Sequence, residues 1–509
     1  MLNLTGKDRI IIPAILVLSA FLLFINLGGK DYWSDEIFSL PKLNTPKIVL
    51  TQCSFDVHPP LFFLLEFYWI RMFGSSETAT RSLPVIFALM GIITAGLIAD
   101  KILPRSNLKL YLLLLAVSPF YLFYARMTRY YTLTSLLSLL TLYFFLDLLK
   151  TPKLSKQLPF WLLALLLIYT DYVGFLALFC LGLYFFWHNR QRARICLQFI
   201  FGAAVLILLY LPWISNLLYG AGSGTAPYPQ DDALSGREFH LLSFIIHNSI
   251  QSAVRIIYTV YNFTLGETVY PWHPAIIFGV LGAAALLVTS LRKTKTPPAF
   301  WIFTLFLPFL LYIIAVVLYG KVFSAANFAL LPSKIFFLQP LWLMFLLKSE
   351  KQNWLFKSGL ALILVFSILS LYNYHRGIQY LNPKYQVPWH QIALQLQKQY
   401  HPGDLVVTDE TPLLHYLRKT PVNCYGLVGA ETYISELHHP LKVYLAIRHR
   451  GEESIYLEGI KLRDRLTQIY GAPECRGYVK IEGMQKKFWS FLLGKQIDYY
   501  LIVYTYSII

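Results

Sequence analysis

Residues 9–28 read RIIIPAILVLSAFLLFINLG, and residues 31–60 read DYWSDEIFSLPKLNTPKIVLTQCSFDVHPP. The first stretch is an apolar run of about 20 residues, the length that a helix needs to cross a bilayer. Because its apolar part follows Lys7 and Arg9 and lacks a small-residue cleavage site, we interpret it as an uncleaved first span. The second stretch carries acidic residues and a histidine in a chain of which only 14% is charged. Together they predict a membrane protein with a functional acidic loop after its first span.

The composition extends this prediction to most of the chain. Of 509 residues 56% are hydrophobic and 16% aromatic, well above the averages of soluble proteins. The formal net charge of +17 comes from basic residues that cluster between apolar runs, a pattern typical of positive-inside topology and not of nucleic-acid binding. About eleven candidate spans lie at 9–28, 82–100, 109–125, 131–149, 158–171, 172–188, 196–213, 272–291, 299–319, 330–347 and 354–372.

One apolar run is too short to count as a span. Leu61–Phe73 would extend only about 20 Å as a helix, less than the hydrocarbon thickness of about 30 Å. We therefore expect an interfacial or re-entrant helix, which keeps all basic clusters on one side. The first loop 29–81, the second loop 214–271 and the tail 373–509 then share the outward face.

The expected fold class is an all-α polytopic membrane domain over 1–372, followed by a small extracytoplasmic α/β accessory domain over 373–509. In the tail we expect a helix over 389–400, a strand over 405–407 and a helix over 413–418. No nucleotide-binding glycine pattern accompanies them. In the second loop, residues 241–261 predict another interfacial helix.

The pair Asp35 and Glu36 is the first candidate for chemistry. A carboxylate near a membrane is retained when it is solvated, paired or useful. Adjacent residues point in different directions, so we predict that Asp35 faces the substrate and acts as a general base toward an acceptor hydroxyl. The alternative is an ordinary pair of loop acids or a helix N-terminal cap after Ser34.

Asp56 and His58 form the second candidate, in FDVHPP before two rigid prolines. They are suited to orienting Asp35, binding an acceptor or ligating a divalent cation. The alternative is a turn that ends the loop.

Basic and aromatic residues at outward span ends suit a phosphate group. Arg81, Arg126 and Arg129 offer bidentate hydrogen bonds to phosphate oxygens, with Tyr130 beside them and Lys334 as a further cation. The alternative is interfacial anchoring, which Arg, Lys and Tyr commonly provide.

Two further pairs complete the candidates. Asp171 and Tyr172, where two spans meet, are placed to contact a sugar hydroxyl or simply to form a hairpin turn. Cys424 and Cys475 are candidates for a disulfide in an oxidising compartment, although their spacing does not establish that they meet. The five cysteines show no metal-binding spacing.

The motifs WSDE, FDVHPPL, GSSETATRSLP, SPFYLFYARMTRYY and YTDYVGF, taken together, resemble the protein O-mannosyltransferase and aminoarabinose-transferase group. These are polytopic GT-C glycosyltransferases, related to glycosyltransferase family 39, that use polyprenyl-phosphate sugars. The resemblance covers about the first 190 residues well and implies the GT-C fold. It also implies that Asp35 is the catalytic base supported by Glu36, that Asp56 and His58 line the cavity, and that Arg81 and Arg129 lie near the lipid phosphate.

The resemblance has two departures. Members of the aminoarabinose-transferase branch hold zinc with acidic and histidine residues, but one of those acids corresponds to Val57, so the cofactor stays unknown. Relatives often carry an Arg-Tyr pair where this chain has NFALLPSK, residues 327–334.

The predicted function is transfer of a sugar from a polyprenyl-phosphate donor to a hydroxyl of a protein, lipid or glycan acceptor, with inversion. We expect it on the periplasmic face of a bacterial inner membrane. The alternative is a lipid or glycolipid flippase, and a silent scaffold is a third reading. No inverted repeat is visible and the charges gather at one face, which favours the enzyme.

Overall fold

The computed structural model describes residues 6, 8–40, 45–55, 58–222, 256–292, 294, 296–322, 332–380, 382–408, 410–427, 430, 434, 442–448, 453–493 and 498–507. The chain forms two compact units. In their described parts, the first takes in Met1–Gly28, Leu40–Ala226 and Leu242–Gln379, and the second takes in Gly29–Ser39 and Tyr380–Ile509. The segment with Asp35 and Glu36 therefore belongs to the same unit as the C-terminal domain.

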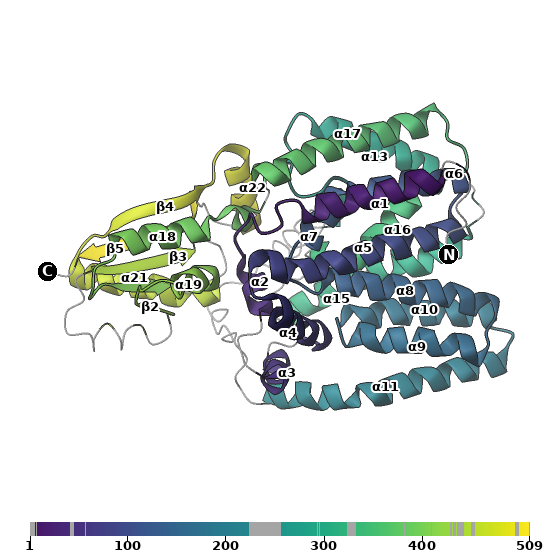
Figure 1. Cartoon of the computed structure of the whole chain (residues 1–509), viewed down its shortest axis with the longest axis horizontal. Helices are drawn as coiled ribbons and strands as arrows, with labels where there is room; N and C mark the ends of the chain where they lie inside the picture. Colours follow the sequence, from purple (N-terminus) through teal and green to yellow (C-terminus); the bar gives the residue numbers. More distant parts are fainter. Residues whose placement is uncertain are drawn as a thin grey trace. The chain divides into compact units, whose positions relative to one another are not determined.

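The first unit is a bundle of helices (Figure 1). Two short helices, α3 (Pro46–Phe55) and α4 (Leu61–Phe73), follow α1 (Asp8–Phe24) in this unit. The next helices are α5 (Glu77–Ile102), α6 (Arg105–Ala116), α7 (Pro119–Ala125), α8 (Tyr131–Lys150), α9 (Leu154–Ile168), α10 (Val173–Asn189) and α11 (Ala193–Gly222). After a helix over Ile256–Leu265 come α13 (Ile276–Ser290), α14 (Pro298–Trp301), the π-helical η1 (Ile302–Phe306), α15 (Leu307–Val322), the 3-10 helix η3 (Pro332–Leu338), α16 (Gln339–Leu346) and α17 (Trp354–Arg376).

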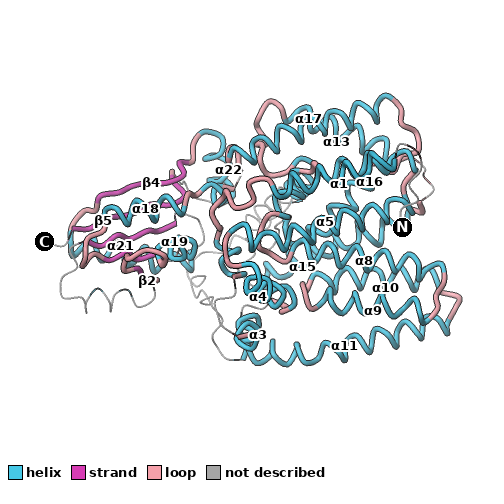
Figure 2. The backbone as a smooth tube through the Cα atoms, viewed as in Figure 1, coloured by secondary structure: helices cyan, strands magenta, loops and turns pink. Residues whose placement is uncertain are grey.

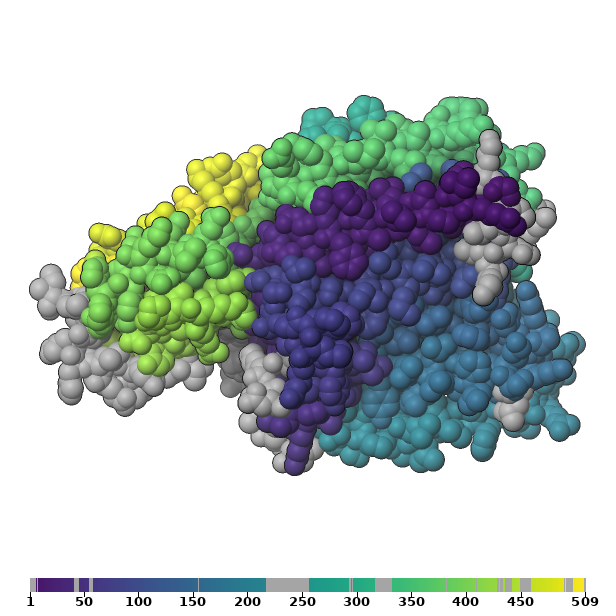
Figure 3. Space-filling view, viewed as in Figure 1, coloured from purple at the N-terminus to yellow at the C-terminus, as the bar shows by residue number. Residues whose placement is uncertain are grey.

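Helix length and exposed apolar surface identify the first unit as a multi-pass membrane domain. Among the described residues five helices are long and apolar enough to cross a membrane, or six if the bent pair α6 and α7 forms one span. The sequence-based number of about eleven is higher because several apolar runs form shorter helices, such as α9 with 15 residues and α10 with 17. Helix α1 lies on the surface shown in Figure 3 (purple). Its residues Ile10, Val17 and Phe21 are 76%, 69% and 59% exposed. Such surface is stable against lipid.

Close backbone contacts hold the bundle together. Gly282 on α13 faces Gly359 on α17, and a Cβ atom on Gly282 would lie only 2.9 Å from the carbonyl oxygen of Gly359. Small residues allow this approach, which van der Waals packing rewards in the membrane. The break between α6 and α7 bends the path by 52° at Ser118 and Pro119. Ser118 caps α7 by accepting the backbone N–H of Tyr121.

The second unit contains a five-stranded sheet with the order β2-β1-β3-β5-β4 (magenta in Figure 2). Its strands are β1 (Leu405–Thr408), β2 (Cys424–Tyr425), β3 (Lys442–Arg448), β4 (Glu474–Lys480) and β5 (Tyr499–Ser507). The first three are mutually parallel, whereas β5 runs antiparallel to β3 and β4. The helices of the unit are α2 (Ser34–Ser39), η4 (Pro383–Gln386), α18 (Trp389–Gln399), α19 (Thr411–Leu417), α21 (Glu453–Tyr470) and α22 (Gly483–Leu493).

The sheet core follows the strand alternation. Val443, Leu445 and Ile447 of β3 pack in one cluster with Leu462 and Leu466 of α21. From the intervening β3 position, the hydroxyl of Tyr444 donates to the carbonyl of Gln399 at the end of α18. Helices therefore cover both faces, as the α/β layer arrangement requires.

The predicted fold class is confirmed: a helical membrane domain is joined to a small α/β domain. The expected short helix at Leu61–Phe73 is present with those bounds. The expected tail elements also form, as α18, β1 and α19, each within two residues of its predicted ends. In the second loop α11 continues past Ile214 to Gly222, and most of the predicted helix 241–261 lies outside the described residues.

Cys424 and Cys475 are both free thiols. They lie on β2 and β4, the two edge strands of the sheet, with three strands between them. At about 4.8 Å per strand the separation is roughly 19 Å, far beyond the reach of a disulfide. A bridge between them within one chain is excluded.

Candidate functional site

A basic and aromatic cluster surrounds Tyr130 in the first unit. The Nζ of Lys334, in η3, donates to the Tyr130 hydroxyl at 2.6 Å. The guanidinium carbon of Arg129 lies 4.9 Å from the centroid of the Tyr130 ring and 5.8 Å from that of Tyr131. Arg129 is only 4% exposed. Lys334 and Arg129, both predicted to bind a phosphate, thus contact the same aromatic residue, Tyr130, at the start of α8.

His58 reaches the same ring from the loop before α4. Its imidazole centroid lies 5.8 Å from the Tyr130 ring and 5.8 Å from the Phe63 ring. The loop is held in place by two backbone bonds, from the His58 N–H to the Cys53 carbonyl and from the Leu61 N–H to the Tyr169 carbonyl, each 2.9 Å. The loop therefore packs against the end of α9, which leads to Asp171.

Asp171 supplies the acidic group of the cluster from the turn between α9 and α10. Its carboxylate accepts the Val173 N–H at 3.2 Å and the Thr134 hydroxyl at 3.5 Å. Burial raises the pKa of the Asp171 carboxyl to about 6, while the nearby charges of Lys334 and Arg129 limit the rise. The pKa of Asp171 therefore depends on the charges of Lys334 and Arg129, and an anion that binds these two cations would change it.

Tyr172 follows in the same turn and contacts another helix. Its hydroxyl accepts the indole N–H of Trp213, on α11, at 3.2 Å. This bond ties α11 to the α9–α10 turn. The predicted contact of Tyr172 with a sugar stays a prediction.

Arg81 and Arg126 bind the end of α1. Arg126 donates to the carbonyls of Leu22, Ile25 and Asn26 at 3.3, 2.6 and 2.9 Å, and Arg81 donates to that of Leu27 at 3.2 Å. A helix C-terminus carries unpaired carbonyls and partial negative charge, which these guanidinium groups compensate. The two residues thus have a structural role, and their predicted contact with a phosphate stays a prediction.

Asp35 and Glu36 lie on α2 in the second unit and differ in environment. Glu36 is 1% exposed, and its carboxylate accepts the Trp33 N–H at 3.3 Å, which caps the helix. Asp35, at the preceding position, is only partly buried. Of the two, Asp35 is therefore the more accessible to solvent, and its predicted role as the base stays a prediction.

Asp56 lies outside the described residues. Among the residues that the structure does describe, no three His, Cys, Asp or Glu side chains group as a metal site. The cation prediction depends on Asp56 and stays a prediction.

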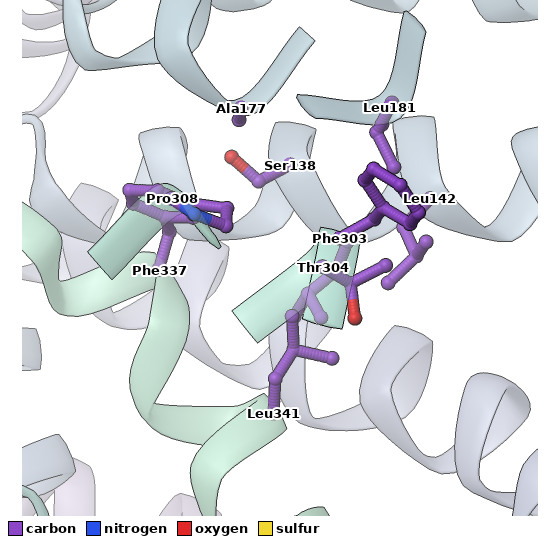
Figure 4. Close-up of a pocket in the computed structure, with 10 residues that line it drawn as sticks. Ser138, Leu142, Ala177, Leu181, Phe303, Thr304, Pro308, Phe337 and Leu341 are labelled. Carbon is purple, nitrogen blue, oxygen red and sulfur yellow. The ribbon is translucent and has the colours of Figure 1, made fainter. Parts of the chain in front are cut away.

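An apolar pocket lies within the bundle (Figure 4). Ser138 and Leu142 of α8 line it together with Phe337. Ser138 is one helical turn, about 6 Å, beyond Thr134, and Phe337 is three residues beyond Lys334. The remaining lining residues are mostly apolar: Leu139, Ala177, Leu181, Phe303, Thr304, Pro308 and Leu341. The helices α8 and η3 thus contribute residues to both the charged cluster and the apolar pocket.

Buried acids elsewhere in the bundle were missed by sequence reasoning. Glu267 is 4% exposed and accepts the hydroxyl of Tyr124. Glu66 in α4 is fully buried. The signal was present in both cases, because each is a lone acid within an apolar stretch.

Comparisons with known proteins place these features in context. No family model and no curated protein matches the sequence. The structure is similar to ArnT from Cupriavidus metallidurans in the apo state, at 13% identity and a TM-score of 0.45, with 98% of each chain covered. It is also similar to that ArnT bound to undecaprenyl phosphate, at 13% identity and a TM-score of 0.43 over 98% of each chain. A third similar structure is the Archaeoglobus fulgidus oligosaccharyltransferase tethered with an acceptor peptide containing the NVT sequon, at 12% identity and a TM-score of 0.40, over 85% of this chain and 68% of that chain.

At this identity, residue roles rest on the geometry of the chain itself.

Proposed function

We propose that the chain is a membrane glycosyltransferase that moves a sugar from a polyprenyl-phosphate donor to an acceptor hydroxyl. The observation that carries the proposal is the adjacency of charged and apolar elements in the first unit. Lys334 and Arg129 supply cations for a phosphodiester, and the apolar side chains beyond Ser138, which line a cavity of about 30 Å³, offer contact surface for part of a hydrocarbon chain. A lipid-linked phosphate is the class of ligand that needs both.

The proposed reaction is a single displacement. Asp35 takes the proton of the acceptor hydroxyl, and the oxygen attacks the anomeric carbon of the sugar. The bond from that carbon to the phosphate oxygen breaks, and the polyprenyl phosphate leaves with the bonding electron pair. Arg129 and Lys334 stabilise the charge that develops on the leaving phosphate. Attack opposite the leaving group inverts the anomeric configuration.

In this proposal Asp171, Tyr172 and His58 contact the sugar or the acceptor. Arg81 and Arg126 support the phosphate region through the end of α1. The active face is periplasmic. A membrane-impermeant maleimide added to intact cells should therefore label Cys475, which is exposed on β4, and a Cys475→Ser variant is the matched control.

The test uses purified protein in lipid nanodiscs, radiolabelled polyprenyl-phosphate sugars and a crude envelope fraction as acceptor. We expect loss of donor and transfer of label by the native protein, and transfer that is at least about a hundredfold slower by Asp35→Asn. The configuration at the anomeric carbon of the product, read by NMR, tests inversion. Retained configuration would contradict the single displacement.

A transport assay in lipid vesicles, with native protein and Asp35→Asn compared, distinguishes a glycosyltransferase from a flippase. If labelled donor crosses the bilayer without chemical change, equally in native protein and Asp35→Asn, the chain is a transporter and the proposal fails.

A further inference from the structure

Five consecutive residues before Asp35 are bound by the C-terminal domain, although 350 residues or more separate the partners in the sequence. Lys30 donates from Nζ to the hydroxyl of Tyr380. The carboxylate of Asp31 accepts the backbone N–H of His390, in the first turn of α18, at 2.8 Å. The segment is therefore fixed at its start by two separate elements of the domain.

Tyr32 is bound through both its backbone and its ring. Its backbone N–H donates to the hydroxyl of Tyr416, on α19, at 2.9 Å. Its ring, fully buried, meets His415 edge to face at a centroid distance of 5.5 Å and an angle of 87°. Because a buried N–H that lacks a partner is costly, the Tyr416 hydroxyl determines where this backbone sits.

The next residue, Trp33, is held by η4. The Nζ of Lys384 lies 4.0 Å from its ring centroid, and the Tyr385 ring lies 5.2 Å away at an angle of 71°. Trp33 is 7% exposed. Its backbone N–H is the one that Glu36 caps, so this aromatic contact determines where α2 begins.

Ser34 connects α2 to a buried ion pair in the domain core. Arg448, the last residue of β3, donates from Nη2 to the Ser34 hydroxyl at 3.1 Å. The same guanidinium binds Glu410 in a bidentate fashion at 2.5 and 2.6 Å. Glu410 is fully buried and its N–H donates to Thr408 at the end of β1. Through Arg448, the sheet thus forms a charge-assisted hydrogen bond with Ser34, the residue directly before Asp35.

We infer that the C-terminal domain is a positioning device for the acidic helix, with Ser34, Tyr416 and Arg448 as positioning residues for the reaction of Asp35. The inference rests on the proposed function and adds a role for the domain. A carboxylate on a helix of six residues cannot hold its own orientation, because isolated helices of this length are unstable in water. The hydrogen bonds and ring contacts of residues 30–34 supply the missing order.

The experiment removes single hydrogen bonds and measures both order and catalysis. In Tyr416→Phe the ring stays and only the hydroxyl is lost, and in Ser34→Ala only the acceptor of Arg448 is lost. We expect amide hydrogen exchange of a peptide spanning 30–39 to be at least about fivefold faster in both variants. We expect kcat to fall by about tenfold to a hundredfold, because a small misplacement of a reacting group has effects of this size. The donor KM should not change, since Arg129 and Lys334 are untouched.

Two controls distinguish positioning from general damage. Tyr478→Phe removes a hydroxyl in the same domain that donates to Gln395 at 3.0 Å, and it should change neither exchange in 30–39 nor kcat. Ser34→Thr restores a hydroxyl and should return kcat to near the native value.

Unchanged exchange in 30–39 for both Tyr416→Phe and Ser34→Ala would overturn the inference, whatever the activity. Faster exchange with native kcat would show that the domain orders α2 without serving the reaction, which also overturns it. If the native protein turns over no donor at all, the proposed function fails. The exchange comparison then still decides whether the domain holds α2.

Discussion

The two charged regions of the chain are built in opposite ways. The cation cluster of the first unit draws His58, Arg129, Tyr130, Asp171 and Lys334 from four places in the sequence. The two acids of α2 are adjacent in the sequence, yet their support comes from residues 380–448. In the first region the positive charge is divided between Arg129 and Lys334, so the loss of one leaves the other in place. A site of the second kind depends on a single group and its orientation.

The largest effect is expected at Asp35 itself. Asp35→Asn removes the proposed base but keeps shape, and kcat should fall by about a hundredfold to ten-thousandfold. Glu36→Gln keeps a cap acceptor for the Trp33 N–H and should lower kcat far less. Steady-state kinetics on both variants make the comparison. Equal losses would mean that the exposure difference between the two acids has no functional meaning.

A smaller effect is expected from one cation of the cluster. Lys334→Met removes the bond to Tyr130 and one positive charge, so donor KM should rise by about tenfold to a hundredfold with little change in kcat. Lys348→Met is the matched control, because Lys348 also lies over an aromatic ring, 4.8 Å from the centroid of Phe345. Its donor KM should stay native. A larger loss in kcat than in KM would place Lys334 in the chemical step.

Substitutions of Arg126 and Arg129 should affect different measured quantities, fold stability for Arg126 and donor KM for Arg129. Arg126→Met removes three bonds to the carbonyls at the end of α1, and we expect it to destabilise the fold by about 2–4 kcal/mol. Arg129→Met should instead raise donor KM, since its guanidinium packs on Tyr130 and Tyr131. Thermal unfolding and donor kinetics on both variants measure the difference. A raised KM with native stability in Arg126→Met would restore its predicted role at the phosphate.

Sequence reasoning reached the helical membrane domain and the short helix Leu61–Phe73, because both depend on the length of apolar runs. It named the members of the cation cluster but not their shared contact at Tyr130, which forms only when η3 meets the start of α8. It also placed Asp35 and Glu36 in the membrane domain. The bonds of residues 30–34 to the C-terminal domain depend on contacts across hundreds of residues, which no local pattern encodes.

The smallest expected effect is a pH dependence of donor binding that originates at Asp171. With a pKa of about 6, its carboxyl is neutral at pH 5 and charged at pH 7, where it competes with the donor phosphodiester for Lys334 and Arg129. Donor affinity should therefore fall by roughly fivefold between these pH values. Measuring Kd in an Asp35→Asn background removes turnover from the comparison.

Asp171→Asn in that background should abolish the pH dependence. The stability of the fold gives an independent check of the sign. The pKa of Asp171 rises from 3.8 in its unperturbed state to about 6 when folded, so as pH increases the unfolded chain loses its proton first. Stability from this group is thus present below about pH 4 and is lost as the pH rises to 6. The Asp171→Asn variant should therefore gain stability relative to the native protein as the pH rises from about 4 to 7. If donor affinity falls with pH equally in Asp35→Asn and in the double variant with Asp171→Asn, the titrating group is not Asp171. No carboxylate of the protein would then compete with the donor phosphate for Lys334 and Arg129.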